Sequence, residues 1–505
     1  MLLALPAVAN AAQRYAAPGS TVTSGCTAPG TSPGPCNIVS AINGSAANDE
    51  VIIESGSYGS RLTPLSTTLQ PAKGPVLIHG AQKQPRPVIY SAASFGFAMT
   101  GGSTLSDVDI EQVGPTAALF SDNALIDHVI ADGIGANTTG CDYMVDTTLI
   151  DSVCASLGGT GGYGVSTAEA LSGTHTFTLR NDTVYASPSG YAAMYLSAGP
   201  GPLQVNVTNT ILRGGAFDIQ AAGGPVTATL DHSNYASTSG TAITPAGTGT
   251  NQTSPPLFVD ITTGDLHELR FSPTVDAGAT DSANGLLDLD GDARSFEGHT
   301  DIGAYEFVVP PAVTLGPANA IGPTSASLSG TVLNGAADEA QVEVQWGTTA
   351  SYGHTTGEAA YAVATAPVPY AATLTGLPPN TVIHYRFVAT NSGGTNATPD
   401  RTFTTLPLML GNLRLHRRRF RRHTTVSYTD QYASLARFTV LRCTRHKHRR
   451  HCKPVRHFSH LDMVGQNSFR LKRGRLTSGP YLLQAIPILQ GFSGQPSTVR
   501  FTIIS

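Results

Sequence analysis

Leu149-Ile-Asp151-Ser-Val-Cys154 and Leu179-Arg-Asn181-Asp-Thr-Val184 are two copies of a phrase that recurs through residues 103–237. The phrase is an aliphatic residue, a spacer, Asp or Asn, two further residues and an apolar residue. The other copies are Leu105-Ser-Asp107-Val-Asp-Ile110, Leu125-Ile-Asp127-His-Val-Ile130, Val207-Thr-Asn209-Thr-Ile-Leu212 and a degenerate Leu230-Asp-His232-Ser-Asn-Tyr235. The copies start 20, 24, 30, 28 and 23 residues apart. This irregular spacing predicts stacked coils that share a core but differ in their loops.

Each copy joins two short β-rich runs through one polar residue and lacks the 3.6-residue apolar spacing of a helix. A single coil cannot bury its apolar face, whereas stacked coils bury a continuous core. Asp and Asn tolerate tight bends and bond to nearby backbone groups. The sequence therefore predicts a right-handed parallel β-helix with a ladder at one corner, formed by Asp107, Asp127, Asp151, Asn181 and Asn209. A β-propeller is the alternative, but its blades need about 40–50 residues.

Composition indicates an extracellular all-β protein rather than a cytosolic enzyme. Charged residues are 13% of the 505 residues, against about 25% in an average domain. The charge is also unevenly distributed: residues 411–505 contain 19 Lys or Arg and 2 Asp or Glu, while the rest of the chain is acidic. A basic final domain is expected to favour polyanionic partners.

The first residues favour export. Residues 1–11 end in Ala9-Asn10-Ala11 after a short apolar run, which is typical of the end of a secretory signal, although a charged start is missing. A buried N-terminal helix is the alternative. No later run is long and apolar enough to span a bilayer, so no transmembrane segment is expected.

Six cysteines form three close pairs, which favours disulfides in an exported chain. The pairs are Cys26 with Cys36, Cys141 with Cys154, and Cys443 with Cys452. Each short loop would contribute about 2–3 kcal/mol if its disulfide is unstrained. A metal site is the alternative for the last pair, because three histidines lie between or beside its cysteines.

Two further stretches carry a resemblance to a known family. Cys36-Asn-Ile-Val-Ser-Ala-Ile42 has helical apolar spacing, and it is followed by the predicted strand 51–53 and by Gly56-Ser-Tyr58. This start resembles the pectin-lyase-like parallel β-helix proteins exported by bacteria, in which a short helix caps the first coil. Residues 256–306, with Asp276-Ala-Gly278 and Asp301-Ile-Gly-Ala-Tyr-Glu306, resemble the closing segment of bacterial surface β-helix proteins, described as a choice-of-anchor module. The resemblance implies a β-helix over residues 12–308 and a surface location.

One candidate metal site lies in this stretch. Asp288, Asp290 and Asp292 alternate with Gly291 between the last two, as in the first half of a calcium loop, but the distal Glu is not at its required position. Calcium is the one cofactor that we consider. The alternative is a solvated turn in which Asp caps backbone N–H groups and Arg294 pairs with a carboxylate.

The catalytic candidates are Asp127 and His128, because Leu-Ile-Asp-His resembles the Ile-Asp-His phrase of pectate lyases. The Arg-x-Pro-x-x-Arg phrase that carries the base of those enzymes is missing, as are the Asp-Asp and Gly-His-Gly phrases of polygalacturonases. A turn residue of the ladder is the alternative for Asp127. A carboxylate pair for glycoside hydrolysis stays open. The candidates for stacking on sugars are Tyr143, Tyr163, Tyr185, Tyr191 and Tyr195, although core or loop roles are the alternative.

Two β-sandwiches are expected after Pro310-Pro311. Residues 309–406 resemble a fibronectin type III module, with Gly376-Leu-Pro-Pro-Asn-Thr381 before Tyr385. Residues 407–505 resemble the basic Ig-like domains that end many actinobacterial surface proteins. The expected polyanion-binding residues are Arg417, Arg418, Arg419, Arg421, Arg422, Arg445, Lys447, Arg449 and Arg450, which would attract anionic wall polymer or polysaccharide. A charged but inert hairpin is the alternative.

We therefore expect a secreted or cell-surface protein, monomeric, that binds polysaccharide without catalysis and has no specific nucleic-acid partner. The alternative is a polysaccharide lyase or glycoside hydrolase that uses carboxylates of the β-helix. The fold hosts both kinds of protein and cannot decide between them.

Overall fold

The computed structural model describes residues 12–167, 172–240, 243–245, 249–295, 298–335, 339–364, 366–446 and 449–505, with two compact units, Met1–Val308 and Val309–Ser505. The predicted signal remnant, residues 1–11, lies outside the described residues. The all-β class is confirmed: within the described ranges the one α-helix is α1 (Ile38–Asn43). With six residues, α1 is far too short to cross a membrane, and no other described helix could do so.

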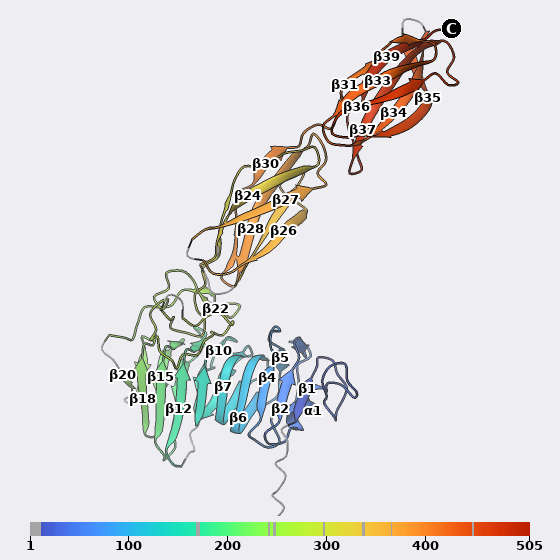
Figure 1. Cartoon of the computed structure of the whole chain (residues 1–505). Coiled ribbons are helices and arrows are strands. Elements are labelled where there is room, and N and C mark those ends of the chain that lie inside the picture. The colour runs from blue at the N-terminus through green and yellow to red at the C-terminus, as the bar shows by residue number, and fades with distance from the viewer. Residues whose placement is uncertain are drawn as a thin grey trace, which may run out of the picture. The chain divides into compact units, whose positions relative to one another are not determined.

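The first unit is a parallel β-helix whose coils place their strands in three stacks (Figure 1). Stack A runs through β1 (Gln13–Ala16), β2 (Glu50–Ile53), β4 (Leu77–Gly80), the middle of β6 (Phe95–Gln112) and β7 (Ala117–Gly133), β9 (Thr147–Ile150), β12 (His175–Arg180), β15 (Leu203–Thr208), β18 (Val226–Asp231) and β20 (Ile243–Pro245). Stack B runs through β3 (Ser57–Tyr58), β5 (Val88–Ser91), the ends of β6 and β7, β10 (Val153–Ser156), β13 (Thr183–Ala186) and β16 (Ile211–Arg213).

Stack C contains the beginnings of β6 and β7, then β8 (Thr139–Val145), β11 (Val165–Ser166), β14 (Ala192–Leu196), β17 (Phe217–Ala221) and β19 (Thr238–Ser239). All these pairings are parallel, so each strand meets the equivalent strand of the next coil. The inward side chains are apolar and almost fully buried, as in the row Phe97, Leu119, Cys141, Val165, Met194 and Ile219. Burial of this continuous core is what holds the coils together.

The corner between stacks A and B is a single residue with a left-handed backbone. Its φ is +55° at Asp107, +54° at His128, +49° at Asp151, +55° at Asn181, +50° at Asn209 and +43° at His232. Asn, Asp and His are the residues other than Gly that enter this region most readily, which explains the recurrence of these types. The predicted ladder is present, but Asp127 does not belong to it.

In the second copy His128 occupies the corner, because Leu105 pairs with Ile126 and Ser106 with Asp127. The prediction had aligned Leu105 with Leu125, one residue too early. Ile126 is fully buried, whereas Leu125 is 36% exposed. Two consecutive aliphatic residues leave the register ambiguous in the sequence, and a shift by one residue reverses which side chains face the core.

The start of the β-helix is closed as expected by α1. Its N-cap, Asn37, accepts a hydrogen bond at Oδ1 from the Ser40 N–H at 2.8 Å, which satisfies a backbone donor that the first turn leaves free. Ile38, Ala41 and Ile42 are buried against the first coil. Gly56-Ser-Tyr58 contains the two-residue strand β3.

The closing segment, residues 256–308, packs on the outside of stack B. It contains the antiparallel pair β21 (Phe258–Asp260) and β22 (Asp265–Glu268) and an isolated bridge between Leu287 and Ala293. Its Leu266, Leu289, Ala304 and Tyr305 form a second apolar core with outward side chains of β10 and β13, namely Val153, Ala155 and Tyr185. One outer face of the β-helix is therefore covered.

The described residues of the second unit form four sheets, in which all but one of the strand pairs are antiparallel. Those within residues 309–406 are β23 (Ala312–Leu315), β24 (Ser325–Leu333) and β27 (Val368–Thr375), and β25 (Ala340–Gly347), β26 (His354–Tyr361), β28 (Val382–Asn391), β29 (Gly394–Ala397) and β30 (Arg401–Thr404). Those within residues 407–505 are β31 (Gly411–Leu415), β33 (His423–Asp430) and β36 (Gly465–Lys472), and β32 (Arg419–Phe420), β34 (Leu435–His446), β35 (Arg449–Leu461), β37 (Gly479–Leu489), β38 (Phe492–Ser493) and β39 (Ser497–Ile503). In the last sheet β32 pairs parallel with β39. Each pair of sheets encloses its own apolar core.

The expectation of disulfide bonds is confirmed, and the structure contains Cys26–Cys36, Cys141–Cys154 and Cys443–Cys452. The first closes a loop within the segment between β1 and α1. The second joins stack C to stack B within the β-helix core, where both cysteines are fully buried. The third crosses the β34–β35 hairpin between directly opposed residues.

Candidate functional site

A pocket of about 620 Å³ lies at the corner of the β-helix, under the edge of the closing segment. Asp107, Asp127 and His128 line it from the β-helix, and residues 80–86 form another wall. Leu287, Leu289, Asp290 and Gly291 line it from the closing segment. The pocket thus brings the catalytic candidates Asp127 and His128 next to one of the three candidate calcium ligands.

Asp127 and His128 form a hydrogen-bonded pair, with His128 Nδ1 2.7 Å from Asp127 Oδ1. Burial lowers the pKa of His128, but the hydrogen bond and the charge of Asp127 outweigh burial and raise that pKa above its ordinary value. Within the described ranges, Asp127, His128 and Asp151 are also the one group of at least three ligand-type side chains close enough to hold a metal ion. An imidazole oriented by a carboxylate can hold or transfer a proton.

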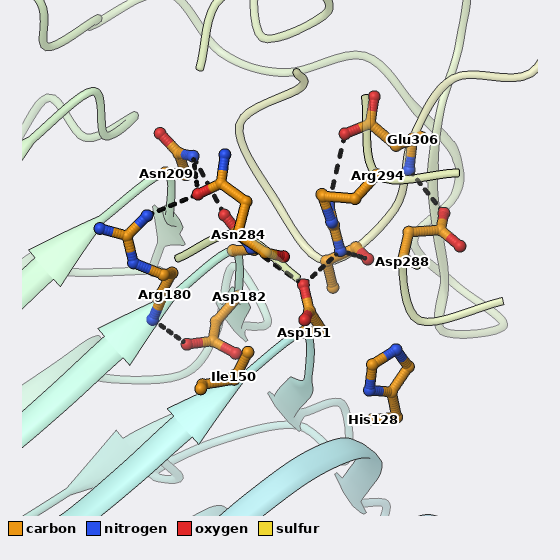
Figure 2. Close-up of polar contacts among 12 residues, drawn as sticks. His128, Ile150, Asp151, Arg180, Asp182, Asn209, Asn284, Asp288, Arg294 and Glu306 are labelled. Carbon is orange, nitrogen blue, oxygen red and sulfur yellow. Dashed lines mark hydrogen bonds and ion pairs between the residues drawn. The ribbon is translucent and has the colours of Figure 1, made fainter. Parts of the chain in front are cut away.

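Next to this pair, a buried polar network joins the ladder to the closing segment (Figure 2). Asp151, Asn181 and Asn209 are linked along the ladder by two side-chain hydrogen bonds of 3.0 Å each. Asn284 and Ala279 of the closing segment accept further hydrogen bonds from Asn181 and Asn209 through their backbone oxygens.

Arg294 is the central cation of this network and is 1% exposed. Its Nη2 lies 2.6 Å from Asp151 Oδ1, and its Nη1 lies 3.5 Å from Glu306 Oε1. The same guanidinium donates to the backbone oxygens of Gly303 and Ala304 at 3.0 and 2.7 Å. Figure 2 shows Arg294 between the two carboxylates. Sequence reasoning suggested only that Arg294 pairs with some carboxylate, because its partner Asp151 is distant in the chain.

The network contains more carboxyl groups than cations. Burial raises the pKa of Asp151 to about 6, although Arg294 acts in the opposite direction. Burial and the charge of Asp301 raise the pKa of Glu306 to about 9, and burial raises the pKa of Asp301 to about 6. Asp182 is fully buried, and burial holds its pKa well above its usual range. These carboxyl groups hold their protons to a higher pH than they would in water.

Asp288 and Asp290, two of the three candidate calcium ligands, bond to different partners. Asp288 is 1% exposed, and its Oδ1 accepts hydrogen bonds from the backbone N–H groups of Asp290 and Asp292 at 3.0 and 2.7 Å. Its Oδ2 accepts from the Glu306 N–H at 2.7 Å. These contacts are those of a capped turn. Calcium binding at this turn stays a prediction.

The Asp290 side chain forms an ion pair with His267. Its Oδ2 lies 2.6 Å from His267 Nε2, while Asp265 Oδ1 lies 2.6 Å from His267 Nδ1. Burial lowers the pKa of His267, but the two carboxylates outweigh it and raise that pKa to about 9. His267 also packs against the Tyr305 ring, with centroids 4.0 Å apart.

The outer face of stack C is a different surface, and it carries aromatic side chains. Adjacent strands bring Phe120, Asp142, Ser166, Tyr195, Gln220 and Ser239 into one row. Asp142 accepts a hydrogen bond from Ser166. At one end Phe120 stacks on Tyr143, with centroids 4.8 Å apart, and contacts Phe95. We call this surface the stack C row.

Further along the stack C row, beside Tyr195, Tyr163 stacks on Tyr195 and Tyr191 with centroid distances of 4.7 and 5.8 Å. Tyr191 is 54% exposed. Four of the five tyrosines singled out in the sequence therefore gather on this face. Tyr185 does not, because it is buried beneath the closing segment and meets Phe258 edge to face. The sequence does not indicate this gathering, because coil length determines which residues become neighbours.

The basic residues of the last domain occupy several strands. Arg417 to Arg422 lie around β32, and the exposed side chains include Arg418, Arg419, Arg421 and Arg422. Arg450 lies on β35 and is exposed. Lys447 lies outside the described residues, and Arg445 and Arg449 are described only in their backbone.

Comparisons with known proteins find similarity to solved structures, but not to family models or curated proteins. No protein-family model matches the chain, and no curated protein matches it. The chain is similar over 20% of its length to the sensor domain of the anti-sigma factor RsgI4 in Pseudobacteroides cellulosolvens, at 23% identity, 97% coverage of that chain and a TM-score of 0.17. A solution structure of that sensor domain shows 24% identity over 19% of this chain and 74% of that chain, with a TM-score of 0.16.

The chain is also similar to pectate lyase Pel9A, at 14% identity over 58% of this chain and 96% of that chain, with a TM-score of 0.31. These TM-scores are too low to support a conclusion on function. The parallel β-helix is established by the strand pairings themselves.

Proposed function

We propose that this chain is a secreted or cell-surface protein that binds polysaccharide without catalysis along its β-helix. The observation that carries the proposal is the stack C row. Aromatic rings at Phe120 and Tyr195, with Asp142 and Ser166 between them and Gln220 beyond Tyr195, offer apolar and hydrogen-bonding surface along consecutive strands. Tyrosine suits such a surface because its ring is apolar while its hydroxyl group forms hydrogen bonds.

The geometry of the stack C row supports an extended ligand. Neighbouring strands lie about 4.8 Å apart, so the row from Phe120 to Tyr195 crosses three strand intervals, about 14 Å. A polymer lying across the strands would meet a ring, two hydrogen-bonding side chains and a second ring in that order. Tyr163 and Tyr195 support each other by stacking, which limits the side-chain entropy lost on binding.

Affinity electrophoresis of the full chain in gels that contain acidic or neutral polysaccharides tests this proposal. We expect retardation by at least one of them, and we expect the Tyr163→Ala/Tyr195→Ala variant to lose it. Tyr90→Ala, in stack B, is the matched control and should be retarded as the parent chain is. Unchanged retardation of the double variant would contradict a role for the stack C row.

The second unit is proposed to act as a spacer and an attachment module. Residues 309–406 are proposed to be a fibronectin type III spacer, and residues 407–505 a basic Ig-like domain that associates with anionic wall polymer. The antiparallel sheets and the strongly basic composition support these assignments. Association by charge should weaken as salt rises.

A carbohydrate-active enzyme is the second candidate, favoured by the Asp127–His128 pair in a pocket of about 620 Å³. The assay measures new unsaturated ends and new reducing ends on the same polysaccharides, with and without calcium. Unsaturated product that requires calcium and is lost in His128→Ala would make the chain a lyase. Reducing ends without unsaturation would make it a hydrolase.

A further inference from the structure

The surface of the last domain is almost free of negative side chains. Its two carboxylates, Asp430 and Asp462, are 1% and 4% exposed. Asp430 accepts hydrogen bonds from the backbone N–H groups of Tyr432 and Ser434 at 3.0 and 2.9 Å. Asp462 accepts from the Tyr428 hydroxyl and contacts His460. Neither can neutralise a surface arginine, so the positive charge of this domain faces solvent.

A cavity of about 810 Å³ concentrates part of that charge. It spans the sheet ordered β32, β39, β37, β34, β35, and three separate chain segments contribute arginines. Arg419 lies on β32, and Arg418 directly precedes it. Arg500 lies on β39, and Arg450 lies on β35 at the opposite edge of the sheet. We call this cavity the arginine groove.

A pair of aromatic rings and a disulfide also line the groove. Tyr481 and Phe501 line it, are each 3% exposed, and stack with centroids 5.4 Å apart. The Cys443–Cys452 disulfide lines the groove beside Arg450. In the part of the chain that the structure describes, none of the four arginine side chains forms an ion pair with a carboxylate. Four uncompensated guanidinium groups around one concavity are an anion-binding arrangement.

The composition of the last domain favours anion binding through guanidinium groups rather than through positive charge alone. Arginine dominates this domain, where the lysines are Lys447, Lys453 and Lys472. Guanidinium is weakly hydrated and presents a planar fork of donors that matches carboxylate and phosphate oxygens. In the groove the forks come from both edges of the sheet. A tetrahedral phosphate offers oxygens in several directions and can be approached from both edges, whereas a planar carboxylate presents two oxygens along one edge.

We propose that the arginine groove binds a linear polymer that carries a phosphate group in each repeat unit. This inference rests on the proposed association of the domain with anionic polymer, and it identifies the residues and the chemistry of that association. Arg500 belongs to the groove although it lies in neither of the basic runs of the sequence. Arg421 and Arg422 belong to a basic run but do not line the groove.

Isothermal titration calorimetry of the full chain with long-chain inorganic polyphosphate tests the proposal, at low and at physiological salt. We expect the variant R418Q/R419Q/R450Q/R500Q to bind about tenfold more weakly or worse and to lose most of the salt dependence. The control R421Q/R422Q/R437Q/R475Q removes the same charge from exposed arginines outside the groove and should bind within about threefold of the parent. Circular dichroism and thermal unfolding check that both variants are folded.

Each other outcome has a defined meaning. No binding of polyphosphate by the parent chain would overturn both this inference and the proposed association with anionic polymer. Equal losses in the two variants would leave the association standing, because charge alone would explain it, and would overturn the groove. Tighter binding of polygalacturonate than of polyphosphate, lost in the groove variant, would overturn the phosphate assignment in favour of carboxylate.

Discussion

Arg294 is the residue on which the attachment of the closing segment depends most. It is almost fully buried, and its guanidinium lies within ion-pair distance of both Asp151 and Glu306. A buried ion pair adds little net stability compared with a well-packed apolar pair, but loss of one partner leaves the other charge unpaired in a medium of low polarity. The consequence of removing Arg294 should therefore be large.

We predict that Arg294→Met destabilises the β-helix unit by about 3–5 kcal/mol. Chemical denaturation followed by circular dichroism measures the change. The control is Arg61→Met, which breaks the pair with Glu111 at 2.5 Å, in which the Arg61 side chain is 63% exposed. Exposed pairs contribute about 0–1 kcal/mol. Equal effects of the two substitutions would contradict the burial argument.

Asn209 combines two roles that can be separated. Its backbone has φ +50°, and its side chain bonds to Asn181 and to both backbone groups of Ala279. Asn123, with φ +58°, has the same backbone conformation but is exposed.

We predict that Asn209→Ala costs about 3 kcal/mol, because backbone strain adds to the loss of buried hydrogen bonds. Asn123→Ala should cost about 1–2 kcal/mol, since it introduces the strain alone. Thermal or urea unfolding of both variants gives the difference. A cost for Asn123→Ala as large as that for Asn209→Ala would mean that the ladder contributes only through its backbone.

Individual residues also show how much of the fold could be predicted from the sequence. The recurrence of Asp and Asn was sufficient to predict a corner ladder, because few residue types accept a left-handed backbone. It was not sufficient to place His128 at the corner, because Leu125 and Ile126 are both aliphatic and either could face the core. The pairing of Arg294 with Asp151 was beyond prediction, since no local pattern connects residues so far apart in sequence.

At the scale of elements, the raised pKa values predict that attachment of the closing segment depends on pH. The folded pKa values of Asp151, Asp301 and Glu306 lie above those of free carboxyl groups, at about 6, 6 and 9. Between the unfolded and folded values the folded chain therefore binds more protons than the unfolded chain. Under that condition stability decreases as pH rises. His267, whose pKa is about 9, also makes stability decrease as pH rises, because its charged form is stabilised only in the folded chain.

We predict that the unfolding temperature of the β-helix unit falls as pH rises from about 5 to about 9. Differential scanning calorimetry across that range measures it. The variant Glu306→Gln should flatten the upper part of the profile, because the group with the highest carboxyl pKa is then absent. A profile that rises with pH would show that these carboxyl groups are ionised in the folded chain.

Elements also differ in how predictable they were. The strands of the β-helix followed from periodicity, and α1 followed from helical spacing after Asn37. The face that each strand turns outward was not predictable, so the gathering of Tyr163, Tyr191 and Tyr195 emerged only from the coil lengths.

At the scale of the whole molecule, the chain contains two separately packed units, divided after Val308. Each unit has its own apolar cores. Independent cores are the condition for independent folding.

We predict that a chain ending at Val308 folds and unfolds at the same temperature as the β-helix transition of the full chain, within about 2–3 °C. Calorimetry on both chains provides the comparison. A lower unfolding temperature of the shorter chain would show that residues 309–505 stabilise the first unit.

The bridging contacts of the closing segment have a consequence for how this chain can change in length. Repeat proteins gain and lose whole units by duplication and deletion, and each new coil would lengthen the stack by one strand spacing, about 4.8 Å. The closing segment holds Asp151, Asn181 and Asn209 at once through Arg294, Asn284 and Ala279. The closing segment therefore fits only one number of coils between residues 151 and 209. An extra coil inserted there would break one of these contacts. Evolutionary or engineered growth of this β-helix should occur at coils outside that interval.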